Sequence, residues 1–551
     1  MRRLPLTDAA FLINETRRTP MHVGGVHLFD LPDGADSVDF LARLFDVLSY
    51  DENLRHPFGA RLKMGPLGVV GPMYWEKDDQ LDIDYHIRHS ALPQPGRYRE
   101  LFALVSRLHS TLLDRSRPLW ELHLIEGLQN RQFALYMKTH HCAIDGAGSM
   151  HLLNSMYSPN QRQLLQYSPF SKEAEKAYKD ALLQARPRRI NPREDEMKNV
   201  TELLREQLGG AVNVGKALRD YASVWLGRNK KLDIPLYKSP RTPLSTKITG
   251  ARRFVAQSWD FARVRAMSKA YGGTLNDGVL GMVGGALRRH LVEQDALPKY
   301  ALKAMAPVSL RAADDTDSAN AVGFITANLA THETDPAARM HAIRESMQAG
   351  KDQLSGMSRR EIEIYTLLTQ TPLLLTALTG NTARFPAFST VVSNVPGPRQ
   401  PMYWNGARLS GLYPVSIPFD GFAVNFTVVS NNDSLDFGIV ACRHSVPQVQ
   451  RMIDYMEEAL VELEVAAGIS SGAGKAPTRK QAAKKPTARK PAAKKAPARK
   501  TPAKKKAASR SVARKKTASK KAPARAKAKK AAAKKKSAPG KARPKAVPKN
   551  R

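Results

Sequence analysis

The chain has 551 residues and a formal net charge of +37, and this charge is distributed unevenly. Residues 475–551 contain 32 of the 87 Lys and Arg residues and none of the 50 acidic ones, so 55 basic residues precede them. The part before position 475 is therefore nearly neutral. Only two cysteines occur, which excludes a disulfide framework and favours a reducing, cytoplasmic compartment.

The N-terminus does not read as a secretory signal, because Asp8, Asn14 and Glu15 interrupt any apolar run before it develops. The most apolar segment, residues 364–380, falls short of the ~18 uninterrupted apolar residues of a membrane span and contains Pro372. We expect a buried or interfacial pair of helices in this segment.

Residues 1–160 alternate short apolar runs with helical periodicity, which predicts an α/β domain. Helices are expected at 40–48 and at 100–114. The run FALYM (133–137) has the length and apolar continuity of a buried strand, so the histidines that follow it should lie at a strand end. A helix is expected to begin after the next glycines, in SMHLLNSMY.

The remaining chain divides by composition into three parts. Residues 161–245 are polar and proline-punctuated, which indicates an interdomain connection with one or two amphipathic helices, mainly within 201–227. Residues 246–470 predict a second α/β domain. Its expected elements are strands at 388–395 and 422–430 and a final helix at 446–468. Residues 471–551 are rich in Lys, Ala and Pro, cannot form a core and are expected to be disordered.

The motif with the clearest chemical meaning is KTHHCAIDGAGSM at 138–150. A histidine can accept a proton near neutral pH, which suits it to deprotonate a hydroxyl group during acyl transfer. Neighbouring residues on extended backbone point to opposite sides, so His140 and His141 should have different roles. Asp145 and Gly146 follow at a glycine turn, where the carboxylate is suited to brace the loop or fix a histidine tautomer.

Three other interpretations of this motif are open. In the first, the motif is a structural histidine-rich loop or half of a metal site. Against a metal site, adjacent histidines are poor joint ligands and no HExxH pattern accompanies them. It belongs to a serine hydrolase, although the sequence has no GxSxG elbow. Lastly, Cys142 beside His141 forms a covalent intermediate, although a cysteine that points away from substrate is more often filler.

Further blocks occur along about residues 5–465. They are the opening LTDAAFLINETRRTPMHVGGV (6–26), Pro118-Leu119-Trp120, Asn276-Asp277, Pro307-Val308-Ser309-Leu310-Arg311 and Asn394-Val395-Pro396-Gly397-Pro398. Together with the HHxxxDG string at 140–146, these blocks resemble, in order, those of the bacterial wax ester synthase/diacylglycerol acyltransferase family. The wider superfamily with this string includes chloramphenicol acetyltransferase and peptide-synthetase condensation domains.

The resemblance implies two chloramphenicol-acetyltransferase-like α/β domains that face each other across a tunnel. It implies that His141 is the general base for the acceptor hydroxyl, that His140 and Gly146 support it, and that Asp145 is structural and pairs with an arginine. Asn276 and Asp277 would shape the second domain's side of the site. For Trp120 of the PLW block, acyl accommodation and plain core packing remain equal alternatives.

The implied reaction moves a long-chain acyl group from acyl-CoA to diacylglycerol or a fatty alcohol, with no permanently bound cofactor and no metal. Three positions depart from the family pattern and bear on substrate preference. They are Gly323-Phe324 in place of Gly-Asn, Val424-Asn425 in place of Leu-Asn, and Ser430-Asn431-Asn432-Asp433 in place of Ser-Tyr-x-Gly.

The basic tail lies outside the resemblance and is similar to the Lys-Ala-Pro-rich ends of linker histones. Its physics favours polyanions: an anionic membrane or lipid-body surface, or a nucleic acid, bound without sequence specificity. A peripheral position at the inner membrane face is therefore expected. Two other functions are open: an inactive acyltransferase fold that acts as a nucleoid-associated protein, and a condensation-type enzyme that uses carrier-protein thioesters.

Overall fold

The computed structural model describes residues 1–50, 53–65, 68, 71–144, 146–164, 167–185, 215–216, 218–229, 231–309, 322–355, 357 and 359–469. Asp145, residues 201–214 of the predicted helical connection, and the predicted disordered tail at 471–551 lie outside the described residues. Contacts divide the chain into Met1–Arg479 and Lys480–Arg551, and the account below concerns the first of these units.

The first half is built on a mixed six-stranded sheet with the order β12-β13-β2-β7-β6-β5. Its strands are β2 (His22–Asp30), β5 (Ile87–Ala91), β6 (Trp120–Leu128), β7 (Gln132–His140), β12 (Tyr403–Trp404) and β13 (Ala407–Val415). Strands β5 and β6 are parallel, and the other neighbours are antiparallel. A small sheet, β1 (Arg2–Arg3), β4 (Met73–Lys77) and β3 (Ala60–Met64), accompanies it.

The helices of this half are α1 (Leu6–Asn14), α2 (Ser37–Leu48), α3 (Ile83–His86), α4 (Tyr98–Leu108), α5 (Gly146–Met156) and α6 (Lys172–Ala185). Helix α2 begins where Asp36 accepts hydrogen bonds from the amides of Val38 and Asp39, which satisfies two free N–H groups. Its apolar side chains, including Phe40 and Leu44, are buried against the sheet. The predicted helix at 40–48 is confirmed as α2, and the one predicted at 100–114 is α4, which ends earlier than expected, at Leu108.

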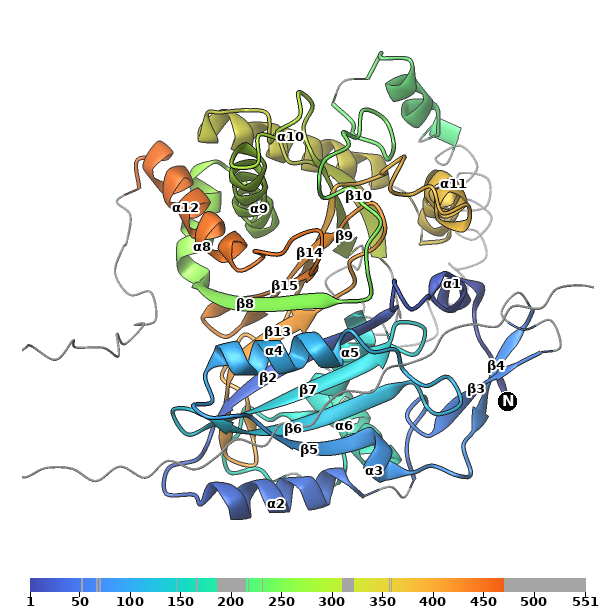
Figure 1. The fold of residues 1–551 in the computed structure, drawn as a ribbon, viewed down its shortest axis with the longest axis vertical. Helices are drawn as coiled ribbons and strands as arrows, with labels where there is room; N and C mark the ends of the chain where they lie inside the picture. Colours follow the sequence, from blue (N-terminus) through green and yellow to red (C-terminus); the bar gives the residue numbers. More distant parts are fainter. Residues whose placement is uncertain are drawn as a thin grey trace, which may run out of the picture. The chain divides into compact units, whose positions relative to one another are not determined.

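The second half contains a six-stranded sheet with the order β10-β9-β11-β14-β15-β8. Its strands are β8 (Arg252–Asp260), β9 (Lys303–Ser309), β10 (Val322–Asn328), β11 (Thr390–Val395), β14 (Val424–Asn431) and β15 (Ser434–Cys442). Its helices are α8 (Phe261–Ala270), α9 (Leu275–Val292), α10 (Pro336–Leu354), α11 (Arg359–Leu378) and α12 (Arg451–Ala466). Helices α8, α9, α10 and α12 gather on one face of the sheet (Figure 1).

The two sheets are joined by an exchanged segment and by a shared core. Strands β12 and β13 belong by sequence to the predicted second domain at 246–470, yet β13 pairs with β2 along Gly24–Asp30. Side chains of α4, such as Leu101 and Val105, lie in one apolar cluster with residues of both sheets. The sequence-based boundaries at 160 and 245 remain predictions, because both sheets belong to one compact unit.

Most predicted elements near the site are confirmed, and one is wrong. The strand at 133–137 is β7, the helix after the glycines is α5, and the strands at 388–395 and 422–430 are β11 and β14. The predicted helix pair at 364–380 is instead part of the single helix α11, which continues through Pro372 although proline lacks the backbone donor of an ordinary helical residue. Among the described residues, no helix is long and apolar enough to cross a membrane.

Candidate active site

The two histidines lie where strand β7 ends and the chain turns. His140 is the last residue of β7 and pairs with His22 of β2, and the amide of His141 extends the ladder by donating to the Met21 carbonyl over 2.9 Å. The Ala143 amide donates to the His140 carbonyl over 2.9 Å, which closes a turn around the second histidine. The turn gives the two neighbouring side chains different surroundings.

His140 is fully buried and its ring is fixed from both sides. The amide of Cys142 donates to Nδ1 of His140 over 3.2 Å, and the Cys142 thiol lies 3.0 Å from the same nitrogen. Because Nδ1 accepts, the ring proton is placed on Nε2, which lies 3.4 Å from Oε1 of Glu15. His140 therefore has the contacts of a positioning residue.

Glu15 is a site residue that the sequence analysis did not assign. Its side chain is 2% exposed and receives the Met21 amide over 2.9 Å and Nη2 of Arg115 over 3.0 Å. Burial by itself would raise the pKa of Glu15, but His140 and these donors together hold it below its ordinary value. The carboxylate thus links α1, the strand end and the loop after α4. The only hint of this role in the sequence was the position of Glu15 within the block at 6–26 that resembles the family.

His141 is half-buried and packs against α1. Its ring stacks on Phe11 with centroids 4.0 Å apart and an interplanar angle of 7°. Leu12, the next residue of α1, lies in a small apolar cluster with Cys142 and Leu119, which holds the helix against the turn. The stacked ring has few orientations available, as a base that must meet one hydroxyl group requires.

A buried ion pair supports β7 immediately before the histidines. Lys138 is fully buried, its Nζ lies 3.2 Å from Oε2 of Glu121, and it donates to the carbonyl oxygens of Leu108 and Thr111. Burial alone would raise the pKa of Glu121, but His123 and the positive charge of Lys138 hold it at about 2. Lys138 lies two residues before His140 on the same strand face, so this network fixes the strand that carries the site.

Cys142 does not have the environment of a nucleophile. It is buried, and burial raises the pKa of its thiol far above the ordinary value. A reactive cysteine needs the opposite shift, because the thiolate is the attacking species. The contacts of Cys142 with His140 indicate a supporting role.

We therefore expect Cys142→Ala to retain most of the enzymatic turnover, since the backbone N–H that donates to His140 is unchanged. Steady-state rates of both proteins check this, together with thermal midpoints to exclude a folding defect. A loss of about 100-fold or more in a folded variant would restore the covalent interpretation.

The PLW block at 118–120 holds the end of β7 in position and packs in the core of the first half. The Leu119 carbonyl accepts the amide of His140 over 2.9 Å, which ties the block directly to the end of β7. Trp120 is 1% exposed, stacks on His86 at 4.6 Å, and donates its indole N–H to the Phe58 carbonyl over 2.9 Å. Of the two alternatives for Trp120, the structure supports core packing.

The ND block begins helix α9. Thr274 is its N-cap, and Asp277 completes a capping box by accepting from the amide and hydroxyl of Thr274 over 2.7 and 2.8 Å. Asn276 is half-buried in the same first turn. The described hydrogen bonds of Asp277 thus serve the helix start, and the predicted roles of both residues at the site remain predictions. Gly146, the last residue of the HHxxxDG string, begins α5.

The block at Asn394–Pro398 lies against one of the three segments that depart from the family pattern, Ser430–Asp433. The amide of Gly397 donates to Oγ of Ser430 over 2.9 Å, and the amide of Asn432 donates to the Pro398 carbonyl over 2.8 Å. A Cβ atom at Gly397 would lie 2.1 Å from the Ser430 carbonyl oxygen, so only glycine fits. Pro398 and Met402 also line, with Asn154 of α5, an open hollow of about 240 Å³.

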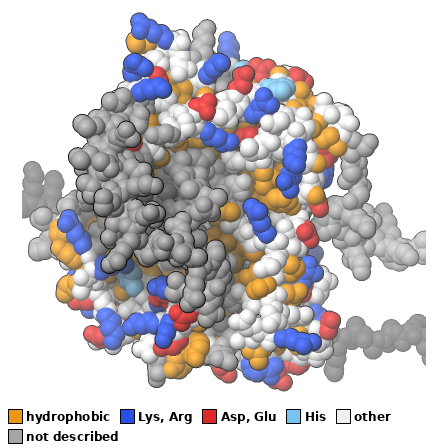
Figure 2. All heavy atoms as spheres, turned by 180° about the vertical axis from the view of Figure 1, so that it is seen from behind, with side chains coloured by type: hydrophobic (Ala, Val, Ile, Leu, Met, Phe, Trp, Pro, Cys, Tyr) orange, Lys and Arg blue, Asp and Glu red, His pale blue; other side chains and the backbone are white. Residues whose placement is uncertain are grey.

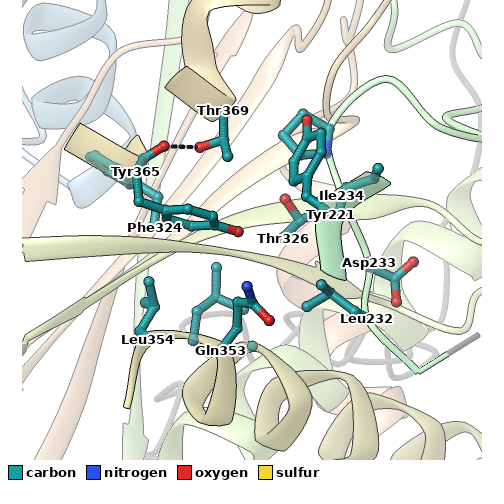
Figure 3. Close-up of a pocket in the computed structure, with 13 residues that line it drawn as sticks. Tyr221, Leu232, Asp233, Ile234, Phe324, Thr326, Gln353, Leu354, Tyr365 and Thr369 are labelled. Atoms are coloured by element: carbon teal, nitrogen blue, oxygen red, sulfur yellow. Dashed lines mark hydrogen bonds between the residues drawn. The ribbon is translucent and has the colours of Figure 1, made fainter. Parts of the chain in front are cut away.

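A second cavity lies in the second half, between α11, β10 and the segment that precedes β8 (Figure 3). It is lined by Phe324, one of the departures, and by polar groups such as Thr326 and Asp233. Its volume of about 20 Å³ suits about one water molecule and not an acyl chain. The acyl tunnel therefore stays a prediction. Within the described ranges, no group of three or more His, Cys, Asp or Glu residues is arranged to hold a metal ion.

The chain is similar over most of its length to known acyltransferases. A probable diacylglycerol O-acyltransferase of Mycobacterium tuberculosis (strain H37Rv) is 41% identical over 465 residues, covering 84% of this chain and 98% of the relative. The O-acyltransferase WSD of Acinetobacter baylyi is 37% identical over 461 residues, covering 84% and 96%. The solved wax ester synthase/diacylglycerol acyltransferase of Marinobacter aquaeolei is 39% identical with a TM-score of 0.67 and covers 85% of this chain and all of that one.

More distant solved structures share the fold alone. The trichothecene 15-O-acetyltransferase of Fusarium sporotrichioides has a TM-score of 0.51 at 12% identity, covering 83% of this chain and 93% of that one. The predicted two-domain α/β fold is confirmed by these matches. The model of the wax ester synthase/diacylglycerol acyltransferase catalytic domain matches residues 4–279, and the family's C-terminal domain matches 318–464. The chain thus belongs to the wax ester synthase/diacylglycerol acyltransferase family and is an O-acyltransferase that esterifies hydrophobic alcohols.

Proposed function

We propose that this enzyme transfers a long-chain acyl group from acyl-CoA to diacylglycerol, to a fatty alcohol, or to both. The observation that carries the proposal is the half-buried His141, stacked on Phe11 beside the rigid His140–Glu15 pair. The named relatives support the two acceptor classes, since one is a probable diacylglycerol acyltransferase and another a wax ester synthase. They do not favour the nucleoid-associated or carrier-protein alternatives.

In the proposed reaction, His141 removes the hydroxyl proton as the alcohol oxygen attacks the thioester carbonyl carbon. The tetrahedral intermediate collapses by breaking the carbon–sulfur bond, and the CoA sulfur leaves and receives the proton from the protonated His141. No group of the protein is acylated, which agrees with the buried, high-pKa thiol of Cys142. The rigid neighbours of His141 lower the entropic cost of aligning base and acceptor.

The other site residues take supporting roles in the proposal. His140 holds the turn through Glu15, and the structural role expected for Asp145, which lies outside the described residues, is carried over as part of the proposal. Asn276 and Asp277, at the start of α9, shape the second half's side of the substrate space.

Competition between acceptors tests the proposal. Purified enzyme is given a long-chain acyl-CoA with hexadecanol and a diacylglycerol together, and the lipid products are resolved. We expect wax ester, triacylglycerol or both, formed in step with CoA release. CoA release without either ester would refute the proposed function and would indicate a thioesterase.

The tail supports a proposed peripheral position on anionic membranes or lipid bodies, with nucleic acid as the competing partner. Its 32 positive charges without an acid between Lys475 and Arg551 favour binding through counterion release. We expect truncation after Gly472 to leave turnover on dispersed substrate roughly intact and to reduce retention on anionic vesicles, DNA or both at low salt.

Retention of both proteins on vesicles and on duplex DNA is measured across a salt series. Binding by the full chain should weaken steeply as salt rises. Equal retention of truncated and full-length protein would remove the tail as an electrostatic anchor.

A further inference from the structure

A cluster of aromatic, apolar and basic side chains, all exposed except the partly buried Tyr237, lies on the second half of the chain. We call it the aromatic face, and it comprises Trp225, Leu226, Tyr237, Lys238, Tyr300 and Phe385. Four of its side chains are highly exposed: 51% for Trp225, 66% for Leu226, 57% for Tyr300 and 52% for Phe385. Figure 2 shows basic side chains with a hydrophobic one among them at the upper left of the face it draws. The histidine turn uses none of these residues.

Ring contacts connect the first part of the aromatic face. Trp225 ends a helical stretch at 218–225, and its ring lies 5.4 Å from that of Tyr237. Lys238 places its Nζ 5.2 Å from the centroid of Tyr237 and 5.9 Å from that of Tyr300. These side chains come from two separate loops, so the cluster is a property of the fold and not of one sequence segment.

Backbone contacts bring the loop that contains Phe385 beside Tyr237 and Lys238. The Ala387 carbonyl accepts from the amide of Leu236 over 3.4 Å and from Oγ of Ser239 over 2.9 Å. These bonds hold the loop after α11 beside the Tyr237–Lys238 pair. Arg384 lies with its guanidinium 5.5 Å from the centroid of Phe385, so a cation accompanies this exposed ring as well.

Strand β9 holds in place the segment that contains Tyr237 and Lys238. Lys303 of β9 is buried, forms a 3.0 Å ion pair with Asp233, and donates to the carbonyl oxygens of Ile234 and Tyr237. Figure 3 shows Tyr221 and Asp233 around the small cavity beside Tyr365 of α11. The backbone that carries Tyr237 and Lys238 is therefore fixed, and ordering these side chains on a partner costs little.

The charge around the face is strongly positive. Residues 215–241 contain seven Lys and Arg residues and two aspartates, of which Asp233 is already paired with Lys303. Arg228, Lys231 and Lys238 are exposed. Exposed Trp, Tyr and Leu side chains bordered by cations have the composition of surfaces that lie in the headgroup region of a lipid layer.

We propose that the aromatic face docks the globular part of this enzyme onto an anionic phospholipid surface. Trp225, Leu226 and Phe385 enter the headgroup boundary while the surrounding cations face the phosphates. A lipid surface is the chosen occupant because the charge is complementary and the acceptors are lipid-dissolved, a reason that rests on the proposed function. The aromatic face shares no residue with the basic tail at 471–551, whose sequence contains no aromatic residue.

Tryptophan fluorescence tests this proposal without reference to turnover. The chain has five tryptophans, and Trp75, Trp120, Trp259 and Trp404 are at most 5% exposed, so Trp225 alone is accessible to an external quencher. The full chain is mixed with phosphatidylcholine–phosphatidylglycerol vesicles whose acyl chains carry bromine. We expect quenching of the wild type and no quenching of Trp225→Phe.

The double variant Trp225→Ser/Leu226→Ser should lose about tenfold or more in vesicle partition at high salt, where the tail contributes little. Val465→Ser is the matched control, because it removes another exposed apolar side chain, on α12, and should bind as wild type. If wild-type protein binds the vesicles but the fluorescence of Trp225 is not quenched, the tail alone binds. This result would overturn the proposal. Equal partition of the double variant and wild type also overturns it.

Discussion

Replacement of His141 by alanine is expected to lower the rate of ester synthesis by about 10²–10⁴-fold, the usual contribution of a general base. The side chain is half-buried and stacks on Phe11, and its replacement leaves the backbone bond to Met21 in place. The variant should therefore stay folded, and the loss should appear in kcat with either acceptor. Steady-state kinetics with thermal midpoints measure both effects.

His444→Ala is the matched control, since this histidine is exposed and lies after the end of β15. It should keep wild-type kinetics. A folded His141→Ala enzyme with near wild-type turnover on both acceptors would show that another group takes the hydroxyl proton.

Replacement of Glu15 by alanine is expected to have the largest effect on stability, about 3–5 kcal/mol, because it leaves Arg115 partly buried without its carboxylate. Nε2 of His140 loses its facing carboxylate at the same time. The result should be a lower midpoint in thermal and denaturant unfolding. Asp79→Ala removes the carboxylate of an exposed pair with Lys77 and should leave the midpoint unchanged.

The contribution of Glu15 to the stability of the fold should also depend on pH, and it should decrease as the pH falls. Its pKa in the folded protein is below the ordinary value of 4.5, so its stabilisation is present above that pH and is lost as the pH falls through the lowered pKa. The difference in thermal unfolding midpoint between wild type and Glu15→Gln should therefore become smaller at acidic pH. A gap that is constant with pH would mean that the charge of Glu15 does not stabilise the fold.

The sequence predicted the parts of the fold that depend on local pattern. The apolar run at 133–137 and the periodicity at 40–48 led directly to β7 and α2, because buried strands and amphipathic helices repeat at fixed intervals. The exchange of β13 into the first sheet could not be predicted in this way. Its pairing with β2 joins residues separated by more than 370 positions, and no local pattern encodes such a contact.

The site was predicted by motif and not by contact. His140 and His141 were located at a strand end, but Glu15 lies 125 positions before His140 and is brought to it only when α1 packs against the turn. Asp277 shows the opposite case: its block suggested a place at the site, whereas its described hydrogen bonds form the capping box of α9. Polar residues near a helix start have this local use regardless of function.

The central claim is that the alcohol attacks the thioester directly, with both substrates bound and without an acylated protein. Initial rates of ester formation over a matrix of acyl-CoA and alcohol concentrations test it most directly. Direct attack predicts that the double-reciprocal lines intersect, because both substrates must be present before CoA leaves. Parallel lines, with acylated protein accumulating when alcohol is withheld, would show a covalent intermediate and contradict the account.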